Sequence, residues 1–386
     1  MQDFEFYLPT RIIFGREALK RFPKEIIPLG RRILLIYGQG SIKKIGLYER
    51  LILTFKELNL QWEEFGGIKS NPTLKQVKEA IQLTRFFNPD YLLAVGGGSV
   101  IDAAKGVACG YYYEGELWDL YERKDTPKQA LPLVVISTIA GSGSEANDIS
   151  VIANEEKGFK LSLRSPLLYP KLSFIDPRLS FTVPKEYIAY GVIDAFSHLF
   201  EYFIFRGHKE PSITEDLLVF LMKNILKWGL IAFEEPENYA ARSQLHWASL
   251  LALSPLTRAG LGSYRFFLHS LEHPLSGSYP LAHGLGLAIL IRAFLKLYGA
   301  HDWVKKFYQR VFEIAPGPHL AKRGLKTYES ILYKFGLPKT LREVGILEGA
   351  LESLVEKAWE IIYIWKADKN FKKTDLEIIY KTAIEG

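Results

Sequence analysis

Residues Tyr91–Lys105 read YLLAVGGGSVIDAAK, an apolar run that ends in glycines and leads directly into a helical pattern. A short, continuously apolar run is typical of a strand that is buried on both faces. Glycines let the backbone approach a ligand closely, and the amide groups at the start of the next helix attract a phosphate. The stretch therefore predicts a strand, a turn and a helix that bind the pyrophosphate of a dinucleotide. A tight turn without a ligand is the alternative.

Similar apolar runs lie on both sides of this stretch. Arg32–Tyr37 and Leu133–Ser137 are short, apolar and followed by Gly or Ser/Thr turns, and Thr73–Phe87 has a helical pattern. Such alternation of strands and helices is typical of a parallel α/β sheet. We therefore expect an N-terminal α/β domain with a Rossmann-like parallel sheet.

The pattern changes after Asp176-Pro177. From about Pro184 onward, apolar residues recur at helical spacing, as in Leu217–Leu226, and strand-like alternation is almost absent. The residue before a proline disfavours helix, so this region is the best place for a boundary. The sequence predicts a dinucleotide-binding α/β domain over residues 1–180 and an all-helical domain over residues 181–386.

A second loop rich in glycine and hydroxyl side chains, Ser137–Glu145, reads STIAGSGSE and follows an apolar strand. Loops at the carboxyl ends of parallel strands face one crevice, where open α/β sheets bind ligands. The presence of two such loops favours a nucleotide site over a purely structural turn.

The turn Gly38–Lys44, GQGSIKK, bears on which nicotinamide cofactor is used. An acidic residue here would bind the ribose hydroxyls of NAD and repel a 2′-phosphate, but the turn holds none. Lys43 and Lys44 offer positive charge, so the turn favours NADP over NAD. The alternative is that both lysines simply point to solvent.

Histidines are grouped in the helical half of the chain. Asp194 and His198 are four residues apart, as are His269 and His273, and His283 follows. A spacing of four places both side chains on one helix face. One aspartate with three histidines suits Fe²⁺ or Zn²⁺ and suits Ca²⁺ or Mg²⁺ poorly. We therefore expect a metal site, although either pair alone could serve as a helix cap or a core hydrogen bond.

Taken in order, these motifs resemble the iron-containing, group III alcohol dehydrogenases along the whole chain. The similarity is greatest to the branch of NADPH-dependent aldehyde reductases and butanol dehydrogenases. The matching landmarks are Pro9–Gly15, Asn71–Thr73, Gly96–Ser99 with Asp102 and Lys105, Ala140–Glu145, Asp176–Leu179, Asp194 with His198 and Glu201, His269–Gly277, and His283-Gly284. Departures are mild, because Ser137-Thr138-Ile139 replaces a more usual Pro-Thr-Thr and Ser142 stands where threonine is common.

The resemblance implies a set of site residues. The metal ligands would be Asp194, His198, His269 and His283, holding Fe²⁺ with Zn²⁺ as the alternative. His273 matches a family position near the substrate that suits proton relay. The positions that match cofactor contacts are Gly38, Gln39, Ser41, Asn71, Gly97, Gly98, Ser99, Asp102, Ser137, Thr138, Ser142, Lys160 and Leu179.

The implied activity is hydride transfer between NADP(H), or alternatively NAD(H), and an aldehyde or primary alcohol. A metal ion stabilises the developing alkoxide, and the nicotinamide supplies the hydride. A glycerol-type polyol dehydrogenase and a sugar-ring-forming synthase share the resemblance. From other classes, the glycine loops argue against a metal-dependent hydrolase, and the metal set argues against a non-catalytic nucleotide sensor.

Composition narrows the location and the partners. The single cysteine, Cys109, excludes an internal disulfide framework and a cysteine-based zinc site. The formal net charge is +6 with a pI near 9.0, but the basic residues are dispersed, so we expect no nucleic-acid partner. Acidic residues near the N-terminus and the lack of an apolar run long enough to span a bilayer favour a cytoplasmic protein without a membrane partner. We also expect a homodimer.

Overall fold

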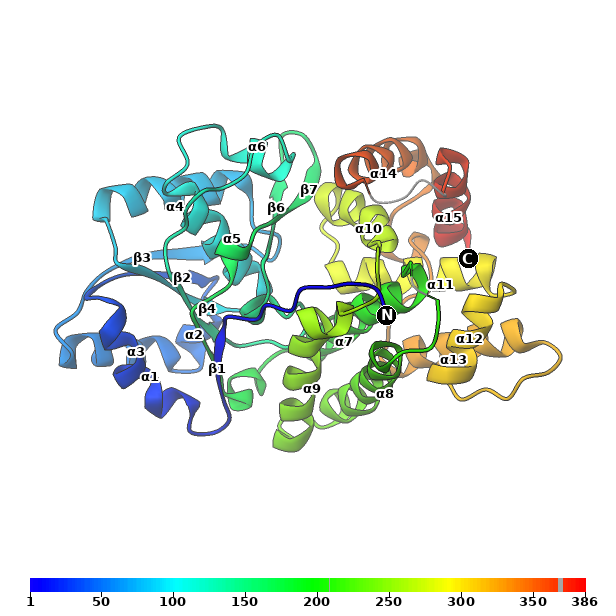
Figure 1. The fold of residues 1–386 in the computed structure, drawn as a ribbon, viewed down its shortest axis with the longest axis horizontal. Helices are drawn as coiled ribbons and strands as arrows, with labels where there is room; N and C mark the ends of the chain where they lie inside the picture. Colours follow the sequence, from blue (N-terminus) through cyan, green and yellow to red (C-terminus); the bar gives the residue numbers. More distant parts are fainter. Residues whose placement is uncertain (208, 367–370) are drawn as a thin grey trace. The chain divides into compact units, whose positions relative to one another are not determined.

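The computed structural model describes residues 1–207, 209–366 and 371–386, which divide into two compact units (Figure 1). The α/β unit comprises Tyr7–Val183 together with Glu237–His246. The helical unit comprises Met1–Phe6 and the described residues of Pro184–Pro236 and Trp247–Gly386.

The α/β unit is built on a six-stranded sheet whose neighbouring strands are all parallel. The strand order is β1-β8-β5-β4-β2-β3. The strands are β1 (Arg11–Phe14), β2 (Arg32–Gly38), β3 (Gln61–Ile68), β4 (Tyr91–Gly96), β5 (Leu133–Ser137) and β8 (Leu172–Ile175). The predicted Rossmann-like parallel sheet is therefore confirmed.

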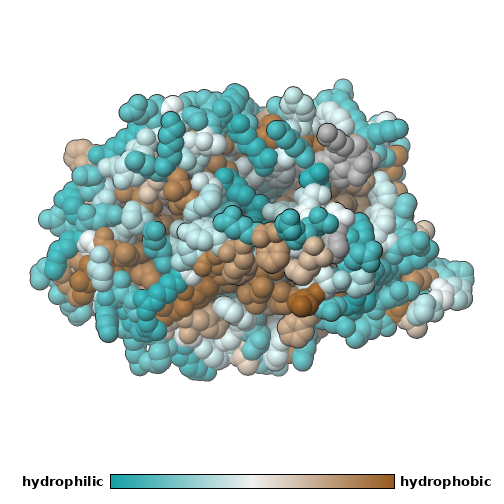
Figure 2. Space-filling view, in the orientation of Figure 1, coloured by the Kyte–Doolittle hydropathy of each residue, from teal (hydrophilic) through white to brown (hydrophobic). Residues whose placement is uncertain are grey.

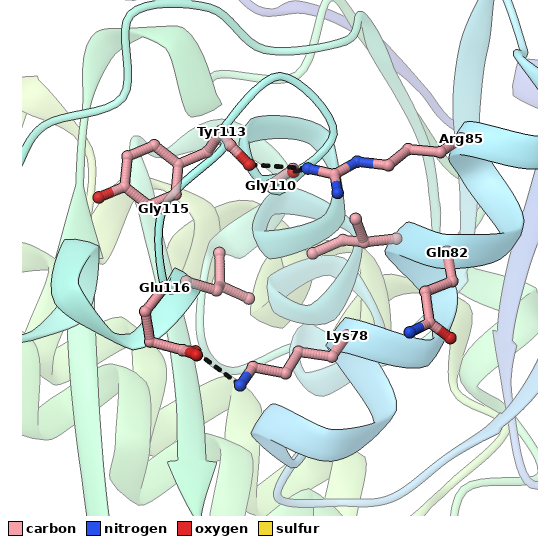
Figure 3. Close-up of a pocket in the computed structure, with 9 residues that line it drawn as sticks. Lys78, Gln82, Arg85, Gly110, Tyr113, Gly115 and Glu116 are labelled. Atoms are coloured by element: carbon pink, nitrogen blue, oxygen red, sulfur yellow. Dashed lines mark hydrogen bonds and ion pairs between the residues drawn. The ribbon is translucent and has the colours of Figure 1, made fainter.

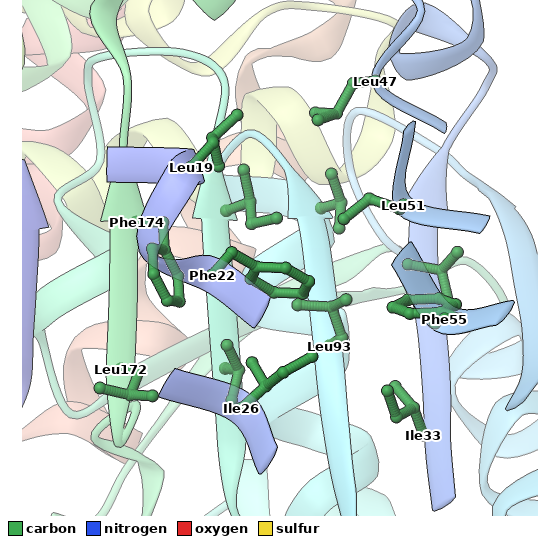
Figure 4. Packing of buried hydrophobic residues seen from close by; sticks show 14 of the residues in the cluster. Leu19, Phe22, Ile26, Ile33, Leu47, Leu51, Phe55, Leu93, Leu172 and Phe174 are labelled. Atoms are coloured by element: carbon green, nitrogen blue, oxygen red, sulfur yellow. The ribbon is translucent and has the colours of Figure 1, made fainter. Parts of the chain in front are cut away.

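Helices cover both faces of the sheet (Figure 1). On one face, α1 (Ala18–Ile26) and α3 (Leu47–Glu57) pack against alternate side chains of the strands, and Figure 4 shows Phe22 and Phe55 pointing into this core. On the other face lie α4 (Leu74–Phe87) and α5 (Gly98–Gly110), which also pack against each other. Two short helices, α2 (Ser41–Lys44) and α6 (Leu117–Tyr121), complete the unit. Burial on both faces explains why the inner strands β2, β4 and β5 are almost continuously apolar.

The strand order contains a switch point between β2 and β4. After β2 the chain moves outward to β3, and it then returns to the other side of β2 to form β4, β5 and β8. Ligands of open α/β sheets bind outside the carboxyl ends of the strands at such a point. Here those ends are Gly38, where the turn predicted to select the cofactor begins, and Gly96, where the first glycine loop begins.

An antiparallel hairpin, β6 (Ile149–Asn154) with β7 (Phe159–Arg164), follows the second glycine loop and packs against α5. This hairpin was not predicted from the sequence. A signal was present, because Phe159–Arg164 alternates apolar and polar residues, FKLSLR, as a half-buried strand does.

The helical unit contains no strand among its described residues, which agrees with the predicted all-helical domain. Its helices are α7 (Lys185–Phe205), α8 (Ile213–Glu234), the end of α9 (Tyr239–Ala252), α10 (Phe267–Ser278), α11 (His283–Tyr298), α12 (Asp302–Val311), α13 (Leu320–Lys334), α14 (Leu351–Trp365) and α15 (Lys373–Glu385). Helix α7 packs against α8 and α11, and α10 packs against α11 and α14.

Helix α7 is the one helix in the described ranges that is long and apolar enough to cross a bilayer. Of its most apolar window, 78% is buried inside the protein, as in the core helix of a globular fold. Its length and composition are therefore weak evidence for a membrane span.

Candidate metal centre and nucleotide crevice

The first glycine loop joins β4 to α5 and leaves the start of that helix open. Gly97 is the N-cap residue in an extended conformation, and among the described residues no side chain caps the helix. Its carbonyl accepts the amides of Val100 and Ile101, at 3.0 and 3.2 Å. An uncapped helix start with glycine at its first position attracts anions through its amide groups and its dipole.

The second loop packs directly on the first. The Thr138 amide donates to the Gly96 carbonyl at 3.0 Å. A Cβ atom on Gly98 would lie 2.3 Å from Ser142 Oγ and 2.9 Å from Ser142 Cβ, so any side chain here would displace Ser142. Gly98 does not have a positive φ. The glycine is thus required by the contact between the two loops, not by its own backbone conformation.

A buried polar network lies under both loops. Lys105 is fully buried, and its Nζ donates to Ser144 Oγ, Asn147 Oδ1 and the Ile149 carbonyl at 2.8–2.9 Å. Asp102 accepts from Ser144 Oγ at 2.5 Å and from a backbone amide of β6. Burial raises the pKa of Asp102 to about 6 and lowers the pKa of Lys105 to about 8. The side chains of Asp102 and Lys105 therefore tie α5 to the second loop. Asp102 was predicted as a cofactor contact, and in the structure it makes its hydrogen bonds within this network.

The remaining predicted cofactor residues also lie in the α/β unit. Gly38 ends β2, and Ser41 begins α2. Ser99 donates to the carbonyl of Ser70, beside Asn71. Side-chain burial is nearly complete for Ser137, Thr138 and Lys160, and Leu179 is half-buried in a short 3₁₀ turn. The predicted positions that lie elsewhere in the loops are Gln39, Gly97 and Ser142.

Lys43 and Lys44 are both exposed, and the ammonium group of Lys43 also contacts two aromatic rings. Its Nζ lies 5.2 Å from the ring centre of Tyr37 and 4.6 Å from that of Tyr48. Such cation–π contacts hold the ammonium group near the end of β2. The positive charge therefore stays at the turn where cofactor choice was predicted to be made.

The predicted metal ligands come together from three helices of the helical unit. Asp194 and His198 lie one turn apart on α7, His269 lies on α10, and His283 begins α11. Asp194 Oδ1 is 3.6 Å from His198 Nε2 and 3.7 Å from His283 Nε2. Ligand atoms of Asp194, His198 and His269 all lie within 4.8 Å of one another. Ligands about 2.1 Å from a tetrahedral ion stand roughly 3.4 Å apart, which is close to these separations.

A glycine next to His283 makes this convergence possible. A Cβ atom on Gly284 would lie 2.1 Å from the Tyr190 carbonyl oxygen on α7. Only glycine therefore lets the start of α11 approach α7 one turn before Asp194. The close approach positions His283 beside the aspartate.

The protonation state of this cluster fits a divalent cation. His198 is buried, and its burial, followed by the neighbouring His269, lowers its pKa well below the usual value. A neutral imidazole is the form that binds metal. In the described part of the chain, His269 Nε2 is buried without a hydrogen-bond partner. An orphaned ring nitrogen beside a carboxylate and two further imidazoles is a donor set that Fe²⁺ or Zn²⁺ would satisfy.

Two glutamates missed as site residues contact these histidines. Glu201 is hydrogen-bonded to His269 Nδ1, and Glu272 is hydrogen-bonded to His283 Nδ1. Both glutamates are fully buried. From the sequence, Glu201 was only a family landmark and Glu272 had no predicted role of its own. Each glutamate lies far from its histidine along the chain, by 68 and 11 residues, so only helix packing brings the pairs together.

His273 lies one turn beyond His269 on the same helix and is almost fully buried. Its ring centre is 5.5 Å from that of His283 and 4.9 Å from that of Trp365. Glu272, His273 and His283 also bring their ligand atoms within 4.8 Å of one another. The residue predicted for proton relay thus adjoins the predicted ligands.

A hollow elsewhere in the α/β unit, between α4 and the segment 110–117, has a different character (Figure 3). Arg85 donates to the carbonyls of Gly110 and Tyr113, and Lys78 pairs with Glu116 at 2.6 Å. Its lining includes no predicted site residue. Both cations are already engaged, so the hollow offers little to an anionic ligand.

Comparison with known families shows which family the whole chain matches. The family model for iron-containing alcohol dehydrogenase matches residues 9–177, and the model for the C-terminal part of the same family matches residues 188–384. The chain belongs to the iron-containing alcohol dehydrogenase family. The predicted family, fold class and enzyme class are thereby confirmed.

Individual relatives of this alcohol dehydrogenase cover nearly its whole length. NADH-dependent butanol dehydrogenase A of Clostridium acetobutylicum is 35% identical over 364 residues, which are 93% of each chain. NADPH-dependent aldehyde reductase YqhD of Escherichia coli is 30% identical, over 93% of this chain and 94% of its own. The crystal structure of an NADH-dependent butanol dehydrogenase A from Thermotoga maritima superposes with a TM-score of 0.95 at 34% identity, covering 100% and 99% of the two chains.

Proposed function

We propose that this enzyme transfers a hydride between NADP(H) and an aldehyde or primary alcohol, with a divalent metal held by Asp194, His198, His269 and His283. The observation that supports the proposal most strongly is the convergence of these side chains from α7, α10 and α11. The metal is proposed to be Fe²⁺, with Zn²⁺ as the alternative. When bound, such an ion acts as a Lewis acid toward a carbonyl oxygen.

The protein's own residues would perform the remaining tasks. The open start of α5 and the loop at Ser142 bind and orient the cofactor pyrophosphate. His273 holds the proton that the product alcohol requires, because its imidazole adjoins His283 and an imidazole ring can both donate and accept a proton. Burial of the surrounding residues excludes bulk water from this proton.

The cofactor is proposed to be NADPH rather than NADH. Lys43 supports this choice, because its charge is held at the end of β2, where a 2′-phosphate would be bound. One of the relatives named above is called NADH-dependent and another NADPH-dependent, so their names do not favour one cofactor. The residues of this chain's own turn are the better guide. The Michaelis constants for both cofactors, in the parent and in Lys43→Ala, test the choice. A lower value for NADH in the parent at equal turnover number reverses it.

The enzyme is also proposed to be a homodimer. Phe4 and Phe6 at the N-terminus are each 52% exposed, and large exposed aromatic side chains are favourable to cover. The face drawn in Figure 2 is mainly hydrophilic, with hydrophobic residues gathered in patches. Light scattering on the protein as it elutes from a size-exclusion column measures the mass of the particle in solution. A monomer at micromolar concentration contradicts the proposal.

The activity itself is tested with a panel of aldehydes on protein reconstituted with Fe²⁺ or Zn²⁺. The expected result is oxidation of NADPH that depends on both the aldehyde and the metal. Turnover that is the same after complete removal of metal overturns the proposed function.

A further inference from the structure

Two buried glutamates, Glu201 and Glu272, each contact one of the proposed metal ligands on the side of the ring that faces away from the metal site. Each one is hydrogen-bonded to the Nδ1 atom of a histidine, so that the Nε2 atom faces the cluster around Asp194. We propose that Glu201 and Glu272 are positioning residues that hold His269 and His283 ready for the metal and strengthen its binding. This inference rests on the proposed metal site.

The contacts of Glu272 show a position prepared for a carboxylate. It lies on α10 and reaches across to the first residue of α11, where Oε2 contacts His283 Nδ1. Ser276, one turn further along α10, donates to the same oxygen at 3.1 Å. A Cβ atom on Gly286 would lie 2.8 Å from Glu272 Oε1. Glycine at this position of α11 therefore leaves room for the carboxylate.

The contacts of Glu201 use both of its oxygens. Oε1 contacts His269 Nδ1, and Oε2 accepts the backbone amide of Leu268 at 2.6 Å. Leu268 lies in the first turn of α10, where amides have no partner within the helix. One carboxylate on α7 therefore fixes both the start of α10 and the ring of its metal ligand.

These contacts have two physical consequences for metal binding. An ionised carboxylate that accepts from Nδ1 fixes the tautomer, which leaves the Nε2 lone pair free for the metal. Its negative charge also adds to the attraction for a cation. Losing such an outer partner typically lowers metal affinity about 10–100-fold. His198 Nδ1 is buried with no hydrogen-bond partner within the described residues, so this support is specific to His269 and His283.

The test measures metal content and the rate at which a chelator removes Fe²⁺ or Zn²⁺ from the full-length protein. Glu272→Ala is expected to lose metal about 10–100-fold faster than the parent. Glu272→Gln should lie between them, because an amide oxygen still accepts from Nδ1 but carries no charge. Gly286→Ala should also speed release, since its methyl group displaces the carboxylate. Glu201→Gln should behave like Glu272→Gln.

Glu215→Gln is the matched control. Glu215 is a fully buried carboxylate of the same unit whose ion-pair partners are Arg206, Lys306 and Arg310. Its replacement should lower the melting temperature without changing metal release. Circular dichroism of the metal-free proteins shows whether each variant is folded.

Two outcomes separate this inference from the metal site on which it rests. If His283→Ala holds no metal but Glu272→Gln, Gly286→Ala and Glu201→Gln release it at the parent rate, the inference is overturned and the site stands. If His283→Ala holds metal as tightly as the parent does, the proposed site itself falls.

Discussion

Gly98 illustrates how single residues shape the nucleotide crevice. Its loop had two explanations from the sequence, namely space for a pyrophosphate or a tight turn without a ligand. The structure has the helical start of α5 at this position and Ser142 Oγ 2.3 Å from the missing Cβ. The second loop, rather than a strained backbone, is what a side chain here would disturb.

We therefore expect Gly98→Ala to weaken NADPH binding about tenfold or more, which corresponds to about 1.4 kcal/mol, with a smaller effect on unfolding. The added methyl group pushes Ser142 and its loop away from the open helix start. Fluorescence titration of NADPH and a melting curve on one preparation measure both effects. Gly349→Ala is the control, because its Cβ would meet no atom within 4 Å. A variant that melts much earlier yet binds NADPH like the parent contradicts this explanation.

His269→Ala should abolish turnover and reduce metal content while leaving the fold intact. The substitution removes one ligand and leaves Glu201 buried without its histidine, which costs on the order of 1–3 kcal/mol. Elemental analysis, circular dichroism and an aldehyde assay decide the matter. Parent-like metal content together with parent-like activity rules out His269 as a ligand.

At the level of elements, the histidine pairs could be predicted from the sequence because they follow helix periodicity. Asp194 with His198 and His269 with His273 each lie one turn apart. Their glutamate partners could not be predicted, because Glu201 and Glu272 reach the histidines across α7–α10 and α10–α11 packing. The close approach at Gly284 is likewise invisible until the two helices are packed.

The buried polar network that ties α5 to the second loop predicts that the stability of the protein depends on pH. Glu145 in this loop is fully buried, and burial raises its pKa from 4.5 to about 7. The folded state therefore binds the proton of the Glu145 carboxyl more tightly than the unfolded state does. The resulting stabilisation is complete below the carboxyl's pKa in the unfolded chain, and it is lost as the pH rises through its pKa in the folded protein.

The free energy of unfolding should therefore fall as the pH rises from about 4.5 to 7, and Glu145 should account for up to about 3 kcal/mol of this decrease. Urea unfolding of the parent and of Glu145→Gln across this range gives the difference due to Glu145, since other groups titrate in both proteins. The variant is expected to have the flatter profile. Identical profiles would show that Glu145 does not titrate in this window.

For the whole molecule, the α/β-then-helical order could be predicted, because strand and helix periods differ along the chain. The exchange of short segments between the two units could not be predicted from the sequence. Met1–Phe6 belongs to the helical unit, where the Gln2 amide donates to the Gly260 carbonyl at 3.2 Å. Glu237–His246 belongs to the α/β unit, where the Arg16 guanidinium lies 3.8 Å from the centre of the Tyr239 ring. Only tertiary contacts assign these segments.

Because the proposed ligands all lie in the helical unit, metal removal should loosen that unit selectively. Hydrogen exchange is expected to speed up in peptides from α7, α10 and α11, since a ligand that binds only the folded form stabilises what it contacts. Peptides from β2, β4 and β5 should be unaffected, and NADPH should protect the start of α5. Equal loosening of both units contradicts this division of tasks.

The most direct test of the account is anomalous diffraction from crystals loaded with Fe²⁺ or Zn²⁺. The account predicts one strong peak per chain, within about 2.0–2.3 Å of Asp194, His198, His269 and His283. Glu201 and Glu272 should stay on the far side of the histidine rings, bound to Nδ1. A peak bound instead by the alternative group of Glu272, His273 and His283, or no peak near these histidines, would contradict it.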